Sequence, residues 1–356
     1  MGPLLPDDSP RGTRYLRRVR GIAIELLALV LVTVLSPVLQ LGALLVDVAL
    51  WLRRRKPWVA LRLVAMLWWF LVGDLLGLTR VLLIRAAGLG RDSPTRRWRL
   101  YRLRMWWAGW HLAGVRRLFG LRLEVEGQEL AGPGRAIYLV RHASIIDNTL
   151  PDVVLARPHG IGLRFVVKRE LRMIPTLDLG GELVPTSFVR RGSGDTDREL
   201  EQLRQLAVDL GPDEGILIYP EGTRMTPRKL ARAKEIVRER QPELADRVER
   251  FEHVLPPRLG GPLTVMADAP EADIVLCGHV GFDGFVSVGD VWRGGLLRTT
   301  IRVRVWRYPA AEVPAGEAER ATWLYDRWLE VDAWVGEQQR ALLAAGEDAT
   351  AVVPHE

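Results

Sequence analysis

The feature that most constrains this chain is an apolar run of twenty-five residues, Ile22 to Val46, whose only charged side chain is Glu25. As a single α-helix the run would be about 37 Å long, which exceeds the hydrocarbon core of a bilayer, roughly 30 Å. A helix of this length in a soluble bundle normally carries a polar stripe, and this run has almost none. We therefore interpret it as a membrane-inserted helix, with a buried hairpin of a soluble bundle as the alternative.

A second apolar segment, Trp58 to Ile84, is interrupted by Arg62, Asp74 and Arg80, so the sequence leaves open whether it spans a membrane or lies in the interface. Basic residues flank the first segment on both sides: Arg14, Arg17, Arg18 and Arg20 before it, and Arg53, Arg54, Arg55 and Lys56 after it. A two-span hairpin would place one of these clusters outside the cell, although basic residues beside membrane helices usually stay on the cytoplasmic side. A hairpin that enters one leaflet, or one span followed by an interfacial helix, avoids this cost.

About twenty polar and basic residues precede the apolar run, which indicates a retained anchor rather than a cleavable signal.

Charge and composition limit the classes of binding partner that the chain is expected to have. The 356-residue chain has a formal charge of +7, which suits a phospholipid surface, a phosphorylated metabolite or nucleic acid. Its thirteen tryptophans favour lipid, because indole rings prefer the headgroup zone. The single cysteine, Cys277, excludes an intramolecular disulfide and a cysteine-based zinc cage, and its apolar surroundings predict a small buried side chain.

The stretch Ser93 to Gly120 has the pattern of an amphipathic helix that begins with an N-cap serine followed by a proline. One predicted face carries Leu100, Leu103, Trp107 and Trp110, and the other carries Arg96, Arg97, Arg99, Arg102 and Arg104. A basic helix with aromatic residues on one side is typical of a membrane surface. The alternative is a domain helix with a solvated charged face.

From Leu121 onward the pattern changes to short apolar runs that alternate with helical segments. The runs predicted as strands are Leu121 to Val125, Ala136 to Val140, Arg164 to Val167, Gly215 to Tyr219, Ile274 to Val280 and Thr299 to Trp306. The segments predicted as helices are Thr196 to Leu210, Lys229 to Glu239 and, as one or two helices, Glu317 to Ala345. Such alternation indicates an α/β fold with a central mixed, mostly buried β-sheet flanked by helices, preceded by the hydrophobic helical segment. We expect membrane-anchoring helices over 1–92 and a second domain over 93–356, with a core at 121–337 and a leading basic helix at 93–120.

Chemistry is first indicated directly after the strand predicted at 136–140, where His142 and Asp147 stand five residues apart in a loop. Active sites of α/β sheets collect at such strand ends. A neutral imidazole can remove a proton from an attacking hydroxyl, and a carboxylate on its far nitrogen fixes the tautomer and stabilises the imidazolium. The spacing alone is weak, because a strand-end histidine beside an aspartate also occurs by chance.

A second group of polar residues, Tyr219-Pro220-Glu221-Gly222-Thr223-Arg224, follows the strand predicted at 215–219. Gly222 permits close backbone approach, Thr223 offers a hydroxyl, and Arg224 can bind a phosphate with two parallel hydrogen bonds. The turn is therefore a candidate phosphate site. A structural ion pair between Glu221 and Arg224 is the alternative.

Together, His142-x4-Asp147 and Pro220 to Arg224 resemble the first and third signature motifs of the 1-acylglycerol-3-phosphate acyltransferase family. The segment Lys168 to Arg191 is similar to the family's second motif, and Val254 to Gly261 to its fourth. The resemblance implies that Lys168, Arg191, Glu221, Gly222, Thr223 and Arg224 position the phosphate of the acceptor, and that Pro257 and Arg258 help to shape the acyl-donor site.

The resemblance covers roughly residues 121–337. Thr223 to Thr226 with Lys229, and the segment Trp323 to Asp332, are similar to the branch that includes lysocardiolipin and lysophosphatidylinositol acyltransferases. Arg141 departs from the family pattern, in which an asparagine often precedes the histidine.

The implied reaction transfers a fatty acyl group from an acyl thioester to the free hydroxyl of a lysophospholipid, most simply 1-acyl-sn-glycerol-3-phosphate, giving phosphatidic acid. His142 acts as general base, Asp147 orients it, and no covalent enzyme intermediate forms. No cofactor or metal is implied, and acyl-CoA or an acyl carrier protein serves as donor. The expected location is the cell membrane, with the active site facing the cytoplasm. Another phosphorylated lysolipid or glycolipid acceptor, and a non-catalytic lipid-binding scaffold, remain as alternatives. Nucleic-acid binding rests on net charge alone and is not expected.

Overall fold

The computed structural model describes residues 3–5, 7, 9–88, 92–144, 146–189, 196–283, 285 and 288–346. Within these residues seven strands form one mixed sheet in the order β1-β7-β6-β2-β5-β3-β4. The strands are β1 Arg122–Glu126, β2 Ala136–Val140, β3 Gly162–Lys168, β4 Thr186–Val189, β5 Glu214–Ile218, β6 Asp273–Val280 and β7 Thr300–Tyr308. Only the β6–β7 pairing is antiparallel among them. The predicted α/β class and all six predicted strands are confirmed, whereas β4 was missed.

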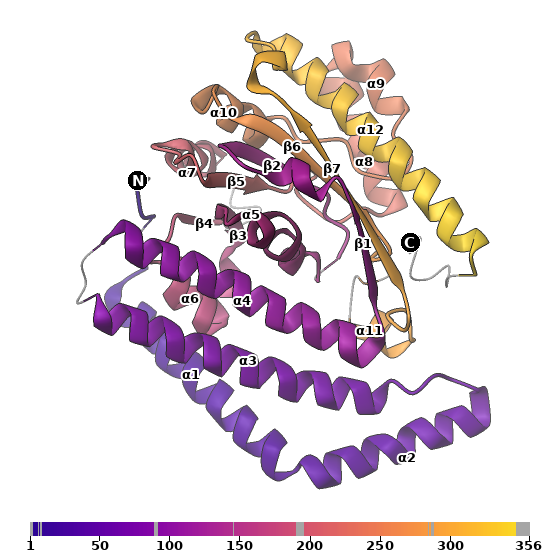
Figure 1. Ribbon diagram of the computed structural model, residues 1–356. Helices are drawn as coiled ribbons and strands as arrows, with labels where there is room; N and C mark the ends of the chain where they lie inside the picture. Colours follow the sequence, from indigo (N-terminus) through magenta and orange to yellow (C-terminus); the bar gives the residue numbers. More distant parts are fainter. Residues whose placement is uncertain are drawn as a thin grey trace.

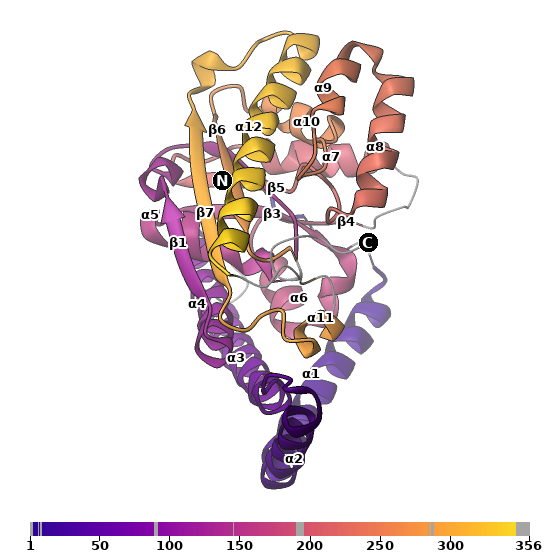
Figure 2. The same ribbon diagram turned by 90° about the vertical axis from the view of Figure 1, so that its right-hand side faces the viewer.

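Helices cover both faces of the sheet (Figures 1 and 2). Their bounds are α1 Arg11–Val34, α2 Ser36–Arg54, α3 Ala60–Ala87, α4 Pro94–Phe119, α5 Arg157–His159, α6 Pro175–Gly181, α7 Thr196–Ala207, α8 Pro227–Arg240, α9 Ala245–Glu249, α10 Gly260–Asp268, α11 Val288–Trp292 and α12 Glu317–Ala344. The helices predicted near 196–210, 229–239 and 317–345 correspond to α7, α8 and α12, and α12 is one continuous helix.

Two hydrophobic cores lie on opposite sides of the sheet because side chains alternate along each strand. On β2, Ile137 and Leu139 belong to a core shared with α7, α8, α9, α10 and α12. Tyr138 and Val140 belong to the second core, shared with α3 and α4. All five β2 residues are buried, which is why this strand reads as a continuous apolar run in the sequence.

Helix α4 begins where the sequence predicts, because the Ser93 side chain accepts a hydrogen bond from the backbone N–H of Arg96, and it ends at Gly120 in the left-handed conformation. The expectation of a surface helix with a basic outer face is wrong for its first turn. Arg96 and Arg97 are buried and pair with Asp92. The helix packs between α3 and the sheet, so it is a domain helix.

The apolar run at 22–46 is not one helix, contrary to the sequence prediction. Helix α1 ends at Val34, Leu35 forms a turn, and α2 begins at Ser36 with Pro37 in its first turn. Proline lacks a backbone N–H and its ring clashes with the preceding turn, so a continuous helix through Pro37 is disfavoured. The two helices meet at a marked angle (Figure 1).

Both ends of the α1–α2 pair are held by the rest of the protein. Near the start of α1, Arg17 Nη2 and Arg18 Nε donate to the Asp178 carboxylate of α6 over 2.9 and 3.0 Å. After α2, the Lys56 ammonium lies 4.7 Å from the ring centre of Trp292 in α11. Each of the two basic clusters that the sequence could not place therefore contacts the part of the protein that carries the sheet, the first through Arg17 and Arg18 and the second through Lys56.

Much of the surface of α1, α2 and α3 is apolar and exposed. Helices α2 and α3 are long and apolar enough to cross a membrane, by length and composition, and only 6% and 33% of their apolar windows are buried within the protein. The exposed residues include Leu27, Val30, Leu31, Val34, Val38, Leu41, Leu45, Leu52, Trp68 and Leu83. Exposed apolar side chains in this number on neighbouring helices indicate an interaction site, and here membrane association.

Candidate active site

The residues singled out in the sequence collect at one edge of the sheet. Strands β2, β3, β4, β5 and β6 run parallel, so their carboxyl ends share this edge. His142 follows β2, Lys168 ends β3, and Glu221 follows β5, the neighbour of β2. The carboxyl edge of such a sheet is where ligands bind in open α/β folds.

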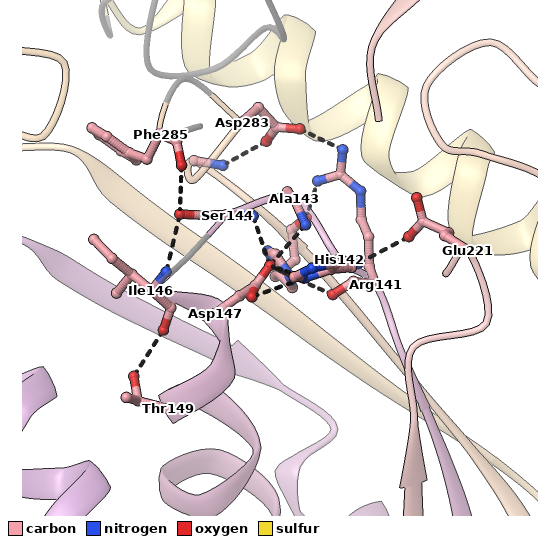
Figure 3. A network of polar contacts seen from close by, with 12 residues as sticks. Arg141, His142, Ala143, Ser144, Ile146, Asp147, Thr149, Glu221, Asp283 and Phe285 are labelled. Carbon is pink, nitrogen blue, oxygen red and sulfur yellow. Dashed lines mark hydrogen bonds and ion pairs between the residues drawn. The ribbon is translucent and has the colours of Figure 1, made fainter. Parts of the chain in front are cut away.

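His142 and Asp147 are in contact, as the sequence hypothesis requires (Figure 3). His142 Nδ1 lies 3.2 and 3.3 Å from the two carboxylate oxygens of Asp147. Asp147 Oδ2 also accepts the backbone N–H groups of Ala143 and Ser144, each over 2.7 Å. The loop thus wraps around the carboxylate, which holds the histidine ring in one orientation.

The electrostatics of this pair determine the histidine tautomer. Burial by itself would raise the pKa of Asp147, but the hydrogen bonds from His142 and from the Ser144 N–H bring the pKa below its ordinary value. The carboxylate is therefore ionised at neutral pH and can only accept, so His142 Nδ1 carries the proton that it donates. The lone pair of Nε2 is left available as a base.

A second polar layer, which the sequence reasoning missed, lies behind this pair. The fully buried Arg141 guanidinium pairs with Asp283 and donates to the carbonyl of His279 over 2.6 Å. His279 Nε2 donates in return to the carbonyl of Arg141 over 2.8 Å and lies 3.7 Å from Asp147 Oδ2. Burial lowers the pKa of His279, so its ring is neutral. These contacts fasten the loop after β2 to the end of β6.

Glu221 is a buried carboxyl group rather than a surface ligand. Its Oε1 accepts the backbone N–H of His142 over 2.9 Å, and its Oε2 accepts that of Leu255 over 3.2 Å. Burial raises the pKa of Glu221 to about 8, opposed by the nearby Arg141 guanidinium. Its visible role is to join the His142 segment to the segment that leads to Pro257. A direct contact between Glu221 and the acceptor phosphate stays a prediction.

The turn after β5 and the loop before α10 form one unit. Arg258 N–H donates to the carbonyl of Pro220 over 2.9 Å. Gly222 has φ +67°, a conformation that favours glycine, and a Cβ atom there would lie 2.9 Å from the Arg258 side chain, which would have to shift. Asp332 of α12 accepts the N–H groups of residues 252–254 and holds the same loop from the other side.

The structure describes the remaining predicted ligands to different extents. Lys168 is exposed at the end of β3. The Lys229 ammonium donates to Thr223 Oγ1 over 3.2 Å and to the Arg224 carbonyl over 3.0 Å, which fixes the turn against the start of α8. Arg191 lies outside the described residues, two positions after the end of β4. The geometry thus brings the Thr223 turn and Pro257–Arg258 together, and the phosphate role of each residue stays a prediction.

An apolar cavity of about 370 Å³ adjoins the histidine loop. Ile146, Asn148 and Thr149, on either side of Asp147, form part of its wall. Most of the remaining lining comes from α3, α4, β3, β4 and α6, and includes Phe70, Leu103, Trp107, Leu112, Phe165 and Leu177. In the wall, Arg104 pairs with Asp152, with Nε to Oδ1 at 3.1 Å, while Arg104 Nη2 is buried without a hydrogen-bond partner among the described residues. Such a cavity suits an alkyl chain.

Comparison with known proteins yields a family model and several relatives. The Acyltransferase family model matches residues 122–238. The 1-acyl-sn-glycerol-3-phosphate acyltransferase epsilon of Mus musculus is 28% identical over 142 residues, which are 39% of this chain and 38% of that protein. Lysocardiolipin acyltransferase 1 of Gallus gallus is 23% identical over 218 residues, 60% of this chain and 56% of that protein. The matched region thus spans between 38% and 56% of the length of these two relatives.

Among solved structures, the 1-acyl-sn-glycerophosphate acyltransferase PlsC from Thermotoga maritima is similar with a TM-score of 0.44 and 16% identity. The match covers 73% of this chain and 95% of that one.

Proposed function

Because residues 122–238 are an Acyltransferase-family domain, and the chain resembles the lysophospholipid acyltransferases, we propose that this protein transfers a fatty acyl group from a thioester to the hydroxyl of a lysophospholipid. The observation that carries the proposal is the contact between His142 Nδ1 and the ionised Asp147, which leaves Nε2 free as a base. That arrangement is the one needed to activate an alcohol.

In the proposed reaction, His142 Nε2 takes the proton of the acceptor hydroxyl while the oxygen of that hydroxyl attacks the thioester carbonyl. The C–S bond breaks and the thiolate leaves, and the proton on His142 can be returned to that sulfur. Asp147 stabilises the transient imidazolium and keeps the ring in place. The reaction needs no covalent bond to the protein, so its rate depends on how well two lipidic substrates are held together.

The proposed acceptor is a phosphorylated lysolipid, most simply 1-acyl-sn-glycerol-3-phosphate. Lys168, Arg191, Thr223 and Arg224 would hold its phosphate at the carboxyl edge of the sheet. Arginine suits this role because its planar group can make two parallel hydrogen bonds to phosphate. The name of the Gallus gallus relative also supports lysocardiolipin as the acceptor, so the acceptor headgroup is part of the test.

The apolar cavity beside Ile146 and Thr149 is the proposed site of an alkyl chain. Its position places a bound chain next to the loop that carries Asp147. Burying a chain there removes apolar surface from water, which supplies binding energy remote from the reacting atoms.

The proposed location is the cytoplasmic surface of the cell membrane. Both ends of α1–α2 are attached to the catalytic domain, through Asp178 and Trp292, so both basic clusters lie on the same side. This supports a hairpin that enters one leaflet, with its apolar sides in lipid, over a pair of complete crossings.

The test is a transfer assay with purified protein, labelled acyl-CoA and a panel of lysophospholipids, with products identified by mass spectrometry. We expect a diacyl product with the wild type and none above background with His142→Ala. The matched control is His159→Ala, which removes a histidine at the opposite edge of the sheet, before β3. Unimpaired transfer by a folded His142→Ala protein would end the proposal.

A further inference from the structure

The segment before α1, of which the structure describes residues 3–5, 7, 9 and 10, lies against the part of the protein that carries the sheet, and we call it the strap. Leu5 is buried in the hydrophobic core shared with α7. The Asp7 side chain is completely buried, and its Oδ1 accepts the backbone N–H of Ser9 over 3.0 Å. Arg169 Nη2 donates to the Ser9 hydroxyl over 3.0 Å. The strap is therefore fastened beside the end of β3.

Asp7 occupies a cationic site, which we call the anion seat, formed by Arg17 of α1 and Arg172 of the 3-10 turn after β3. Arg17 Nη2 donates to Asp7 Oδ2 over 2.6 Å, and the Arg172 guanidinium pairs with the same oxygen. The Arg172 side chain is only 7% exposed, and its guanidinium carbon lies 4.1 Å from the ring centre of Phe188, which fixes its orientation. Burial by itself would raise the pKa of Asp7, but the hydrogen bonds from Arg17 and Ser9 bring it below the ordinary value. The seat thus holds an anion.

The two cations of the anion seat depend on Asp7 to different degrees. Arg17 has a second carboxylate, Asp178, at 2.9 Å. Among the described residues Asp7 is the one carboxylate that pairs with Arg172, whose Nε is buried without a hydrogen-bond partner. A buried charge is costly when it has no counter-ion, so the strap can leave the seat only if another anion replaces Asp7. A phosphate group can do so, because it carries more charge than a carboxylate and binds guanidinium groups with parallel hydrogen bonds.

The surroundings of the anion seat indicate the source of that phosphate. Leu16, next to Arg17, is 68% exposed, and Met173, next to Arg172, is 74% exposed. The two elements are in close contact, because a Cβ atom at Gly21 of α1 would lie 3.3 Å from the Met173 carbonyl oxygen. A soluble phosphate gains nothing from exposed apolar side chains beside the cations. A lipid phosphate lies directly above acyl chains, into which such side chains can insert.

We propose that Arg17 and Arg172 bind the phosphate of an anionic membrane lipid, and that the Asp7 carboxylate of the strap takes its place when the protein is off the membrane. A lipid with a phosphate monoester fits best, because its exposed oxygens can serve both guanidinium groups. Binding exchanges one ion pair for another and frees the strap from the end of β3. The inference goes beyond the proposed function, since it involves neither a thioester nor acyl transfer.

The first test is flotation of the protein with phosphatidylcholine vesicles that contain or lack phosphatidic acid, without any thioester. Asp7→Asn removes the competing charge and should strengthen binding to the phosphatidic acid vesicles about fivefold, whereas Arg172→Ala should weaken it about fivefold. Both changes break the same ion pair, so a general loss of stability would shift binding in one direction only. The matched control is Arg238→Ala on α8, which removes the same charge from an exposed pair with Glu249 and should leave binding unchanged.

The second test follows the strap of the wild-type protein by hydrogen exchange, which needs no variant to fold. The Ser9 N–H, which donates to Asp7, should exchange faster with phosphatidic acid vesicles than with vesicles of phosphatidylcholine or phosphatidylglycerol. Glycerol 3-phosphate in solution tests the soluble source. Equal exchange on all three vesicles, release of the strap by glycerol 3-phosphate alone, or variants that shift binding in the same direction would overturn the inference. Failure of acyl transfer would reject the proposed function without affecting these measurements.

Discussion

Replacing Asp147 by asparagine tests the central geometry with the smallest change in shape. Asp147 Oδ2 accepts two backbone N–H groups, from Ala143 and Ser144, while Oδ1 lies 3.2 Å from His142 Nδ1. The carbonyl oxygen of an asparagine must take the Oδ2 position, because only an acceptor can serve those two N–H groups. Its NH₂ group then faces Nδ1. The imidazole must place its proton on Nε2, and the base is lost.

The expected magnitude follows from this tautomer change. A general base held in the wrong tautomer lowers the rate about 10³- to 10⁴-fold. This corresponds to about 4–5.5 kcal/mol of activation free energy. The free energy of unfolding should fall by only about 1–2 kcal/mol, because both backbone hydrogen bonds remain and only their ionic character is lost.

The pH dependence of stability provides a second check on Asp147→Asn. The pKa of Asp147 is lowered in the folded state, so its stabilisation is fully present above the ordinary value, about 4, and is lost as the pH falls. The gap in unfolding free energy between wild type and variant should therefore shrink in acid.

The assay for Asp147→Asn is kcat for acyl transfer at saturating donor and acceptor, with urea unfolding at several pH values. Asp326→Asn on α12, which breaks an ion pair with Arg247, is the matched control and should keep wild-type kcat. A folded Asp147→Asn protein whose kcat stays within about tenfold of the wild type would refute the reasoning about the tautomer.

Three further changes test other parts of the structure. Because the pKa of Glu221 is raised to about 8, ionisation opposes folding, so wild-type stability should fall as the pH rises from about 4.5 to 8, and Glu221→Gln should flatten this slope in urea titrations. Gly222→Ala should lower the unfolding free energy by about 1–2 kcal/mol, measured by thermal melting, because φ is +67° there. Asp178→Ala removes the carboxylate shared by Arg17 and Arg18, which keep Asp7 and Glu182 as partners, and should destabilise the protein by about 1.5 kcal/mol, with faster tryptic cleavage in α1; unchanged cleavage would count against this anchoring contact.

Much of the fold could be predicted from the sequence because its central strands are buried on both faces. The runs at 136–140 and 274–280 are continuously apolar and correspond to β2 and β6. Strand β4 has only the four residues Thr186 to Val189 at the edge of the sheet, which is too short for a periodic signal.

The predictions failed where tertiary contacts override local pattern. The composition of residues 22–46 indicated one helix, but Pro37 determines the bend near Leu35. The arginines of α4 were assigned to a charged face, although Asp92 allows Arg96 and Arg97 to be buried.

The candidate site was predictable where its parts are adjacent in the chain, as His142 and Asp147 are. The polar layer behind the His142–Asp147 pair could not be predicted. Arg141 lies 138 residues before His279 and 142 before Asp283 in the sequence, and its contact with them depends on the pairing of β2 with β6. The role of Glu221 was likewise hidden, because its partners are the backbone N–H groups of His142 and Leu255.

The attachment of both ends of the α1–α2 pair to the catalytic domain has a consequence for bilayer growth. On the proposed function, a single-chain lipid diffuses sideways to the protein, gains its second chain, and returns to the half of the bilayer from which it came. Each turnover therefore expands one monolayer alone. Balanced expansion of both monolayers then requires a separate step that moves finished lipids from one monolayer to the other.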